Sequence, residues 1–215
     1  MSLINCSECG KEISDKAKKC PGCGCKIVSE KKSKTKVLII TLITILLLSG
    51  IATYFIINKV RENKYMKKYK EIVDIMADTG AKAEDSINTI RQVWSNTIFE
   101  ENDEKTDKYT KTNGVFNDDF NDSLDNLFTD PDFYSKTLEI RTGVMDVDEL
   151  FEKMDNPPRK YKKAYEDLEE FYDIFYEFCN LAVSPEGNLT SYSERTRELD
   201  SDTAKAFKKV TRNIE

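Results

Sequence analysis

Histidine is absent from all 215 residues of the chain. Its absence excludes Ser-His-Asp and Cys-His catalysis, histidine metal ligands and the side chain that most often moves protons near neutral pH. An enzyme built from this sequence would have to use carboxylates, lysine, tyrosine or cysteine. We therefore expect a protein that is not an enzyme, with no catalytic residue and no organic cofactor.

Basic residues are scarce in the long C-terminal part. Residues 78–215 hold 18 Lys and Arg against 32 Asp and Glu, whereas residues 1–36 hold nine against four. Binding to phosphates needs an excess of Lys and Arg, which excludes a broad nucleic-acid-binding face in the C-terminal part. The first 36 residues have that excess but lack a dense basic stripe interleaved with aromatic side chains. Nucleic acid is therefore not the expected partner.

Charge is missing altogether from the 21-residue run VLIITLITILLLSGIATYFII, residues 37–57. A helix of this length spans about 31 Å, close to the hydrocarbon thickness of a bilayer. Fourteen of its residues are Val, Ile, Leu or Phe, which each favour insertion by roughly 0.3–0.6 kcal/mol. The run predicts one transmembrane helix; its length and purity disfavour a buried core helix. The preceding 36 residues are too long for the n-region of a signal peptide, which predicts an uncleaved signal anchor.

Cysteine is rare, and five of the six lie in the first 25 residues. Cys6 and Cys9 are followed, after ten residues, by Cys20 and Cys23. Two Cys-x-x-Cys turns place four thiolates as a tetrahedral zinc ion requires, so these residues are the predicted ligands of a structural zinc. A redox pair would need a surrounding strand-helix-strand pattern, which is absent. Cys25 is left over: it could substitute as a ligand, sense oxidation or, as we favour, be a bystander.

The same segment resembles the short bacterial zinc ribbons of the knuckle-hairpin-knuckle type, over about a tenth of the chain. The resemblance implies two short strands, a bound structural zinc, and a place at the N-terminus of single-pass membrane proteins of Gram-positive bacteria. Cys25 departs from the usual pattern. The matching residues are Cys6, Cys9, Gly10, Ile13, Ala17, Lys18, Cys20, Pro21, Cys23 and Gly24.

The orientation in the membrane follows from the cysteines, because the flanking charges are almost balanced. Seven of the twenty residues before the apolar run are Lys or Arg, and six of the twenty after it. Thiolates that hold a metal suit a reducing cytoplasm. We expect a zinc ribbon (residues 1–28) and a basic linker (29–36) inside, the transmembrane helix over 37–57, and residues 58–215 outside. Lys31, Lys32, Lys34 and Lys36 are then a membrane-proximal positive cluster.

Beyond residue 58 the apolar residues recur every three or four positions, which predicts helices. One helix is expected to run on from the membrane segment, with a possible break at Gly80. Further helices are expected over residues 115–128, 146–154 (with Asp146 as N-cap), 159–183 and 188–210, and no further strand. The fold class is mainly α: a small ribbon, one transmembrane helix and an all-α bundle. The first helix is expected to bury Ile72, Ile75, Met76, Thr79, Ala83, Ile87, Ile90, Val93 and Trp94.

Two features of residues 159–183 could indicate a ligand-binding or metal-binding site, but a structural role explains each of them more simply. The aromatic stripe from Tyr161 to Phe178 could line a ligand groove, although its helical spacing favours core packing. The acidic cluster could suggest a di-metal bundle, which also needs histidine, so a solvated helix face is favoured. The cluster comprises Glu166, Asp167, Glu169, Glu170 and Asp173.

The outer part, with RQVWSNTI early and SPEGNLTSYS late, is similar to helical extracytoplasmic domains of Gram-positive proteins of unknown function. We expect a non-enzymatic membrane protein with a cytoplasmic zinc ribbon and an outer sensing or protein-interaction domain, with envelope signalling or stress response as candidate roles. Its partners would be the lipid bilayer and proteins on one or both sides. The alternatives are a membrane-tethered regulator whose ribbon binds nucleic acid or transcription machinery, and a carboxylate-based envelope enzyme.

Overall fold

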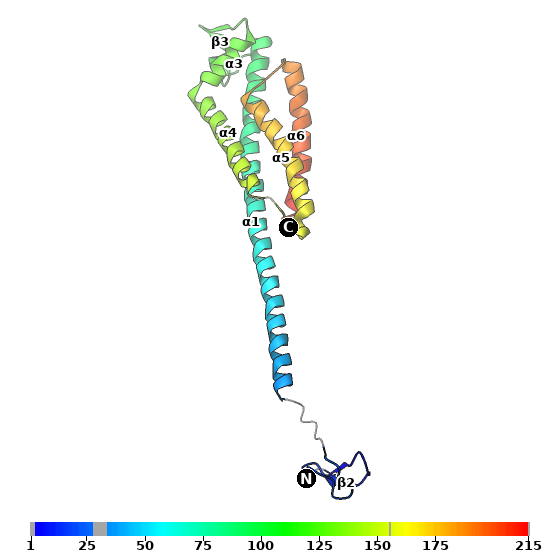
Figure 1. Ribbon diagram of the computed structural model, residues 1–215. Helices are drawn as coiled ribbons and strands as arrows, with labels where there is room; N and C mark the ends of the chain where they lie inside the picture. Colours follow the sequence, from blue (N-terminus) through cyan, green and yellow to red (C-terminus); the bar gives the residue numbers. More distant parts are fainter. Residues whose placement is uncertain (1–2, 28–33, 155, 215) are drawn as a thin grey trace. The chain divides into compact units, whose positions relative to one another are not determined.

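The structure, a computed structural model, describes residues 3–27, 34–154 and 156–214 (Figure 1). It divides into two compact units, residues 1–57 and 58–215, and the division falls between Ile57 and Asn58 inside one helix. Most of the predicted basic linker, including Lys31 and Lys32, lies outside the described residues. The bounds predicted for the ribbon and the linker therefore stay predictions.

The first unit begins with a small antiparallel hairpin. Strand β1 (Leu3–Asn5) pairs with β2 (Glu12–Ser14), with Ile4 opposite Ile13. The buried centre of this module consists of Ile13, Cys6 and Cys20. One isoleucine and two thiols cannot supply the apolar burial that stabilises an independent fold. The module therefore needs a further source of folding free energy, and a bound metal is the usual one for a segment of this size.

Helix α1 (Lys34–Ile98) contains the uncharged run. Among the described helices it is the one long and apolar enough to cross a membrane. The large apolar side chains from Val37 to Ile57 are exposed, and none of the most apolar stretch is buried against protein. Within the described residues, the side chains of this run are therefore not packed in a protein core.

The remainder of α1 carries the predicted core face. Every position that the periodicity assigned to that face is buried, apart from Ile75, which is partly buried. Gly80 does not break the helix, which continues through it to Ile98. The predicted break was wrong because a single glycine costs a helix only about 1 kcal/mol, which the packing on either side outweighs.

The chain then folds into short elements before the next long helices. Helix α2 (Asp107–Thr110) leads into a hairpin of β3 (Lys111–Thr112) and β4 (Val115–Phe116), followed by α3 (Phe120–Thr129). The prediction of no further strand after the ribbon was therefore wrong. The helix expected from residue 115 begins instead at Phe120, because the Asp119 side chain accepts a hydrogen bond from the Asn121 N–H and caps the helix there.

Three long helices complete the second unit: α4 (Pro131–Glu152), α5 (Lys162–Val183, after the 3₁₀ turn η1, Arg159–Tyr161) and α6 (Leu189–Arg212). Figure 1 shows them alongside the C-terminal half of α1. The short helix predicted from Asp146 is the end of α4. Asp130 caps α4, since its side chain accepts from the N–H groups of Asp132 and Phe133, and Pro131 occupies the first turn.

Aromatic side chains join α5 and α6 to α1. Phe171, Phe175 and Phe178 are buried in the core, so these members of the stripe predicted from Tyr161 to Phe178 pack in the interior, whereas its tyrosines are partly buried. The Trp94 ring on α1 lies 5.6 Å from that of Tyr192 on α6. The hydroxyl of Tyr192 donates to the carbonyl of Leu181 at 3.0 Å, which satisfies its polar tip within the fold.

Gly143 is a point where α4 lies close to α1. A Cβ atom added at Gly143 would overlap the side chain of Thr79, which is itself buried. We expect Gly143→Ala to lower the free energy of unfolding of the bundle by about 1–3 kcal/mol, the usual cost of overpacking. Chemical denaturation followed by circular dichroism measures this change.

The matched control for Gly143→Ala is Gly80→Ala. Gly80 is helical too, yet a Cβ added there meets no atom within 4 Å. That substitution is expected to leave stability unchanged or to raise it by up to about 1 kcal/mol. Equal effects of the two substitutions would contradict the close packing of α4 on Thr79.

Candidate metal centre

Two backbone turns of the same geometry carry the paired cysteines. In the first, the N–H of Cys6 donates to the carbonyl of Lys11 and the N–H of Gly10 donates to that of Cys6, both at 2.9 Å. The second turn repeats both bonds at 2.9 Å, from Cys20 to Cys25 and from Gly24 to Cys20. Each turn closes on a glycine with φ of +72°, a conformation that side chains disfavour. The sequence therefore folds into two equivalent knuckles.

The two knuckles bring five sulfur atoms together. The Sγ atoms of Cys6 and Cys23 are 3.7 Å apart, and those of Cys9 and Cys20 are 3.6 Å apart. A tetrahedral ion with metal–sulfur bonds of about 2.3 Å sets neighbouring sulfurs about 3.8 Å apart. Both cross-knuckle distances fit the edges of such a tetrahedron. All six cysteines, including distant Cys179, are free thiols.

Cys25 belongs to the same cluster. Its Sγ lies 3.3 Å from that of Cys6, and the Sγ atoms of Cys6, Cys20, Cys23 and Cys25 all lie within 4.8 Å of one another. These four could hold a metal ion. The predicted set has Cys9 in place of Cys25, and Cys9 lies outside this group of four, with its Sγ 3.6 Å from that of Cys20; the predicted set stays a prediction. Sequence reasoning named Cys25 as surplus and did not place it at the centre. The sequence CPGCGC could have indicated this position, because Cys25 follows the predicted ligand Cys23 by two residues.

Backbone amides favour the thiolate form of the first cysteine in each knuckle. Hydrogen bonds from the N–H of Cys9, and then of Glu8, lower the pKa of the Cys6 thiol to about 6. The N–H groups of Cys23 and then Gly22 lower the pKa of Cys20 in the same way, and the Gly22 nitrogen lies 3.3 Å from the Cys20 Sγ. The thiolate is the form that binds metals. The backbone thus prepares both cysteines as ligands.

An all-sulfur donor set determines what such a centre can do. Thiolates select soft or borderline ions and disfavour magnesium and calcium. Four protein ligands would complete a tetrahedral shell and leave no open position for a substrate or water. The arrangement therefore suits a structural metal that holds the two knuckles together.

In the acidic cluster on α5, two carboxylates form ion pairs with lysines. The Asp167 carboxylate, which is nearly buried, lies 2.9 Å from the Lys163 amine, and the Glu170 carboxylate lies 2.6 Å from the Lys209 amine. The remaining acidic residues of the cluster are exposed. These contacts fit ion pairs on a solvated face.

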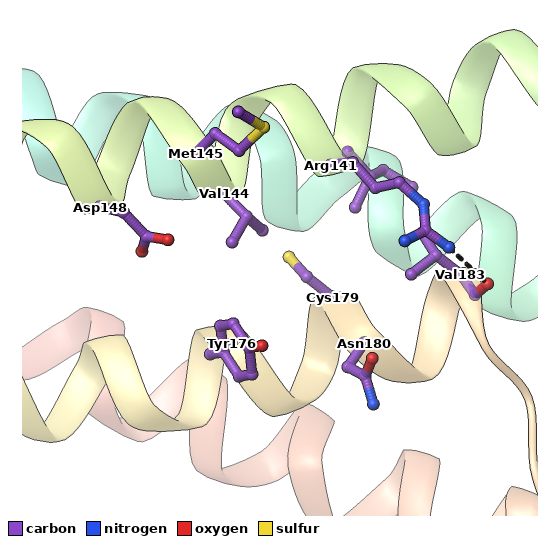
Figure 2. A pocket seen from close by; sticks show the side chains of 9 residues that line it. Arg141, Val144, Met145, Asp148, Tyr176, Cys179, Asn180 and Val183 are labelled. Carbon is purple, nitrogen blue, oxygen red and sulfur yellow. Dashed lines mark hydrogen bonds between the residues drawn. The ribbon is translucent and has the colours of Figure 1, made fainter.

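A cavity of about 320 Å³ lies between α4 and α5. Figure 2 shows Val144 pointing from α4 and Cys179 from α5 into the space between the two helices, while Met145 lies over α4 and Tyr176 over α5 at the edges of that space. Arg141 closes one end, where its Nη2 donates to the Val183 carbonyl at 3.3 Å. Met145 and Tyr176 are large side chains that are 69% and 51% exposed, so the cavity mouth presents apolar surface to solvent.

Cys179 is the sixth cysteine and belongs to helix α5. Its side chain is buried in the floor of the α4–α5 cavity. Burial raises the pKa of this thiol to about 12. The thiol is therefore protonated at neutral pH and behaves as a small apolar side chain.

Comparison with protein-family models, with curated proteins and with solved structures found no match to this chain.

Proposed function

We propose that the chain is a single-pass membrane protein whose N-terminal module holds a structural zinc ion in the cytoplasm and whose helical domain binds a protein partner outside. The observation that carries the proposal is the adjacency, in one chain, of an exposed apolar run in α1 and a five-thiol cluster. The first needs a bilayer and the second a reducing compartment. Zinc is the common ion of closed four-sulfur sites.

Polar side chains within the apolar run support its place in a bilayer. The hydroxyl of Thr41 donates to the Val37 carbonyl at 2.5 Å, and that of Ser49 donates to the Leu46 carbonyl at 2.9 Å. Groups without water must find hydrogen-bond partners within the protein. These hydroxyls find theirs in the helix's own backbone and need no partner from the lipid.

The α4–α5 cavity supports an interaction role for the outer domain. Its volume is at the lower end of small-molecule sites, and it opens to solvent beside the exposed Met145 and Tyr176. A cavity of this size with a partly apolar lining suits an apolar side chain inserted by a protein partner, with Arg141 and Asp148 in the lining to meet polar groups.

A pull-down of the intact protein from crosslinked membranes tests this function. We expect proteins held by the outer domain to be lost with Met145→Glu and retained with Tyr134→Glu. Tyr134 is exposed on the same helix and does not line the cavity. Partners of the module should be lost with Cys20→Ser alone. Recovery of the same proteins with all variants would contradict the proposed interaction role. Salt-dependent binding of nucleic acid by the intact protein would instead favour a membrane-tethered regulator whose ribbon binds nucleic acid.

A further inference from the structure

The zinc module offers one sulfur more than a tetrahedral ion can bind. The Sγ atoms of Cys6, Cys20 and Cys23 lie within 4.8 Å of that of Cys25, and Cys9 approaches the same group through Cys20. The Sγ of Cys9 lies 3.6 Å from that of Cys20, and the Sγ of Cys25 lies 3.3 Å from that of Cys6. Three cysteines are therefore common to the two possible ligand sets, and the fourth position has two candidates.

Cys25 is positioned by a backbone hydrogen bond of the second knuckle. Its carbonyl accepts the Cys20 N–H at 2.9 Å, which ties it into the second knuckle. In the first knuckle the equivalent position is Lys11, whose carbonyl accepts from Cys6 in the same way. The two knuckles thus differ at this position: one presents an amine to solvent and the other a half-buried thiol beside the sulfur cluster.

We propose that Cys9 and Cys25 are alternative occupants of a single ligand position, with Cys6, Cys20 and Cys23 constant. In the exchange one zinc–sulfur bond forms as the other breaks, and the proton lost by the incoming thiol is taken up by the outgoing thiolate. Zinc stays bound throughout, and one of the two thiols is always free to react with an electrophile. This inference rests on the proposed function, in which the module binds zinc, and it adds which cysteines are the ligands.

Zinc content of the full chain in detergent tests the exchange. One zinc per chain is expected for the wild type, Cys9→Ser, Cys25→Ser and the control Cys179→Ser, and none for the Cys9→Ser/Cys25→Ser double variant. Each single variant should bind zinc within about tenfold of the wild-type affinity, because four thiolates remain. Loss of zinc in Cys9→Ser alone, or in Cys25→Ser alone, would show a fixed set and overturn the exchange. Zinc retained in the double variant would overturn it too, whereas a wild type without zinc would overturn the proposed function and the exchange with it.

Alkylation of the unmutated protein gives a readout that no variant's folding can disturb. Brief treatment of the zinc-loaded chain with N-ethylmaleimide, followed by peptide mass mapping, is expected to give one adduct per module, divided between Cys9 and Cys25. Adducts on Cys25 alone would assign Cys9 as the permanent ligand, and adducts on Cys9 alone would assign Cys25; either result overturns the exchange.

Discussion

Cys20→Ser is expected to abolish zinc binding and to unfold the N-terminal module. Cys20 is buried at the centre of the module, where its sulfur faces that of Cys9, and it belongs to both ligand sets. Metal binding contributes about 10–16 kcal/mol in zinc-finger peptides, while the module buries just one isoleucine besides its thiols. Without the metal, nothing in the described part of the module replaces that free energy.

Metal analysis and limited proteolysis measure this effect. The variant should carry no zinc, and residues 3–27 should become sensitive to protease while the helical domain stays resistant. Cys179→Ser, which changes a buried thiol far along the chain, should keep the zinc. A Cys20→Ser protein that retained one zinc and a resistant module would show that the cysteine cluster is not what folds it.

A pair of arginines at the middle of the apolar run, Leu46→Arg with Leu47→Arg, is expected to prevent membrane insertion. Each arginine at a helix centre costs roughly 2.5–3.5 kcal/mol, so the pair costs about 5–7 kcal/mol. The apolar residues of the run favour insertion by about 4–8 kcal/mol in all, which the pair would offset. Both leucines are exposed, so the same substitutions should leave the helical domain folded.

Translation in the presence of membrane vesicles, followed by carbonate extraction, measures insertion directly. The wild-type chain and the control Leu46→Ala/Leu47→Ala should stay in the membrane pellet, and the double-arginine chain should move to the supernatant. If the double-arginine chain stayed in the pellet after extraction, the run would not be what anchors the protein.

The helical domain could be predicted from its periodicity because its helices are long. The spacing of Ile87, Ile90 and Trp94 marks one helix face, and all three are buried. Where the pattern failed, a local interaction was the cause. Asp146 resembled an N-cap, but Asp130 and Pro131 start α4 four turns earlier, and nothing in the sequence around Asp146 interrupts the helix.

The hairpin of β3 and β4 was missed because strands of two residues leave no alternation to detect. A signal was nevertheless present. Asn113 and Gly114 have φ of +54° and +83°, and an Asn-Gly pair at positive φ forms the tightest hairpin turn. The turn residues, rather than the strands they join, could have predicted this element.

The metal centre was predictable in part. The Cys-x-x-Cys spacing predicted Cys6, Cys9, Cys20 and Cys23 as ligands; the structure places Cys6 beside Cys23 and Cys9 beside Cys20, and it groups Cys25 rather than Cys9 with the other three. The approach of Cys25 to Cys6 could not be inferred in the same way. It depends on the second knuckle folding against the first and on the bond from the Cys20 N–H to the Cys25 carbonyl, which are tertiary features.

The central claim, a metal-binding module inside and a helical domain outside, is tested most directly by labelling intact cells with a membrane-impermeant maleimide. The probe position is Ser201→Cys, exposed on α6, and buried Cys179 should not contribute. We predict that Cys introduced at position 201 is labelled on intact cells, whereas Cys9 and Cys25 are labelled only after the membrane is permeabilised. Labelling of the module on intact cells, with position 201 protected, would contradict the account.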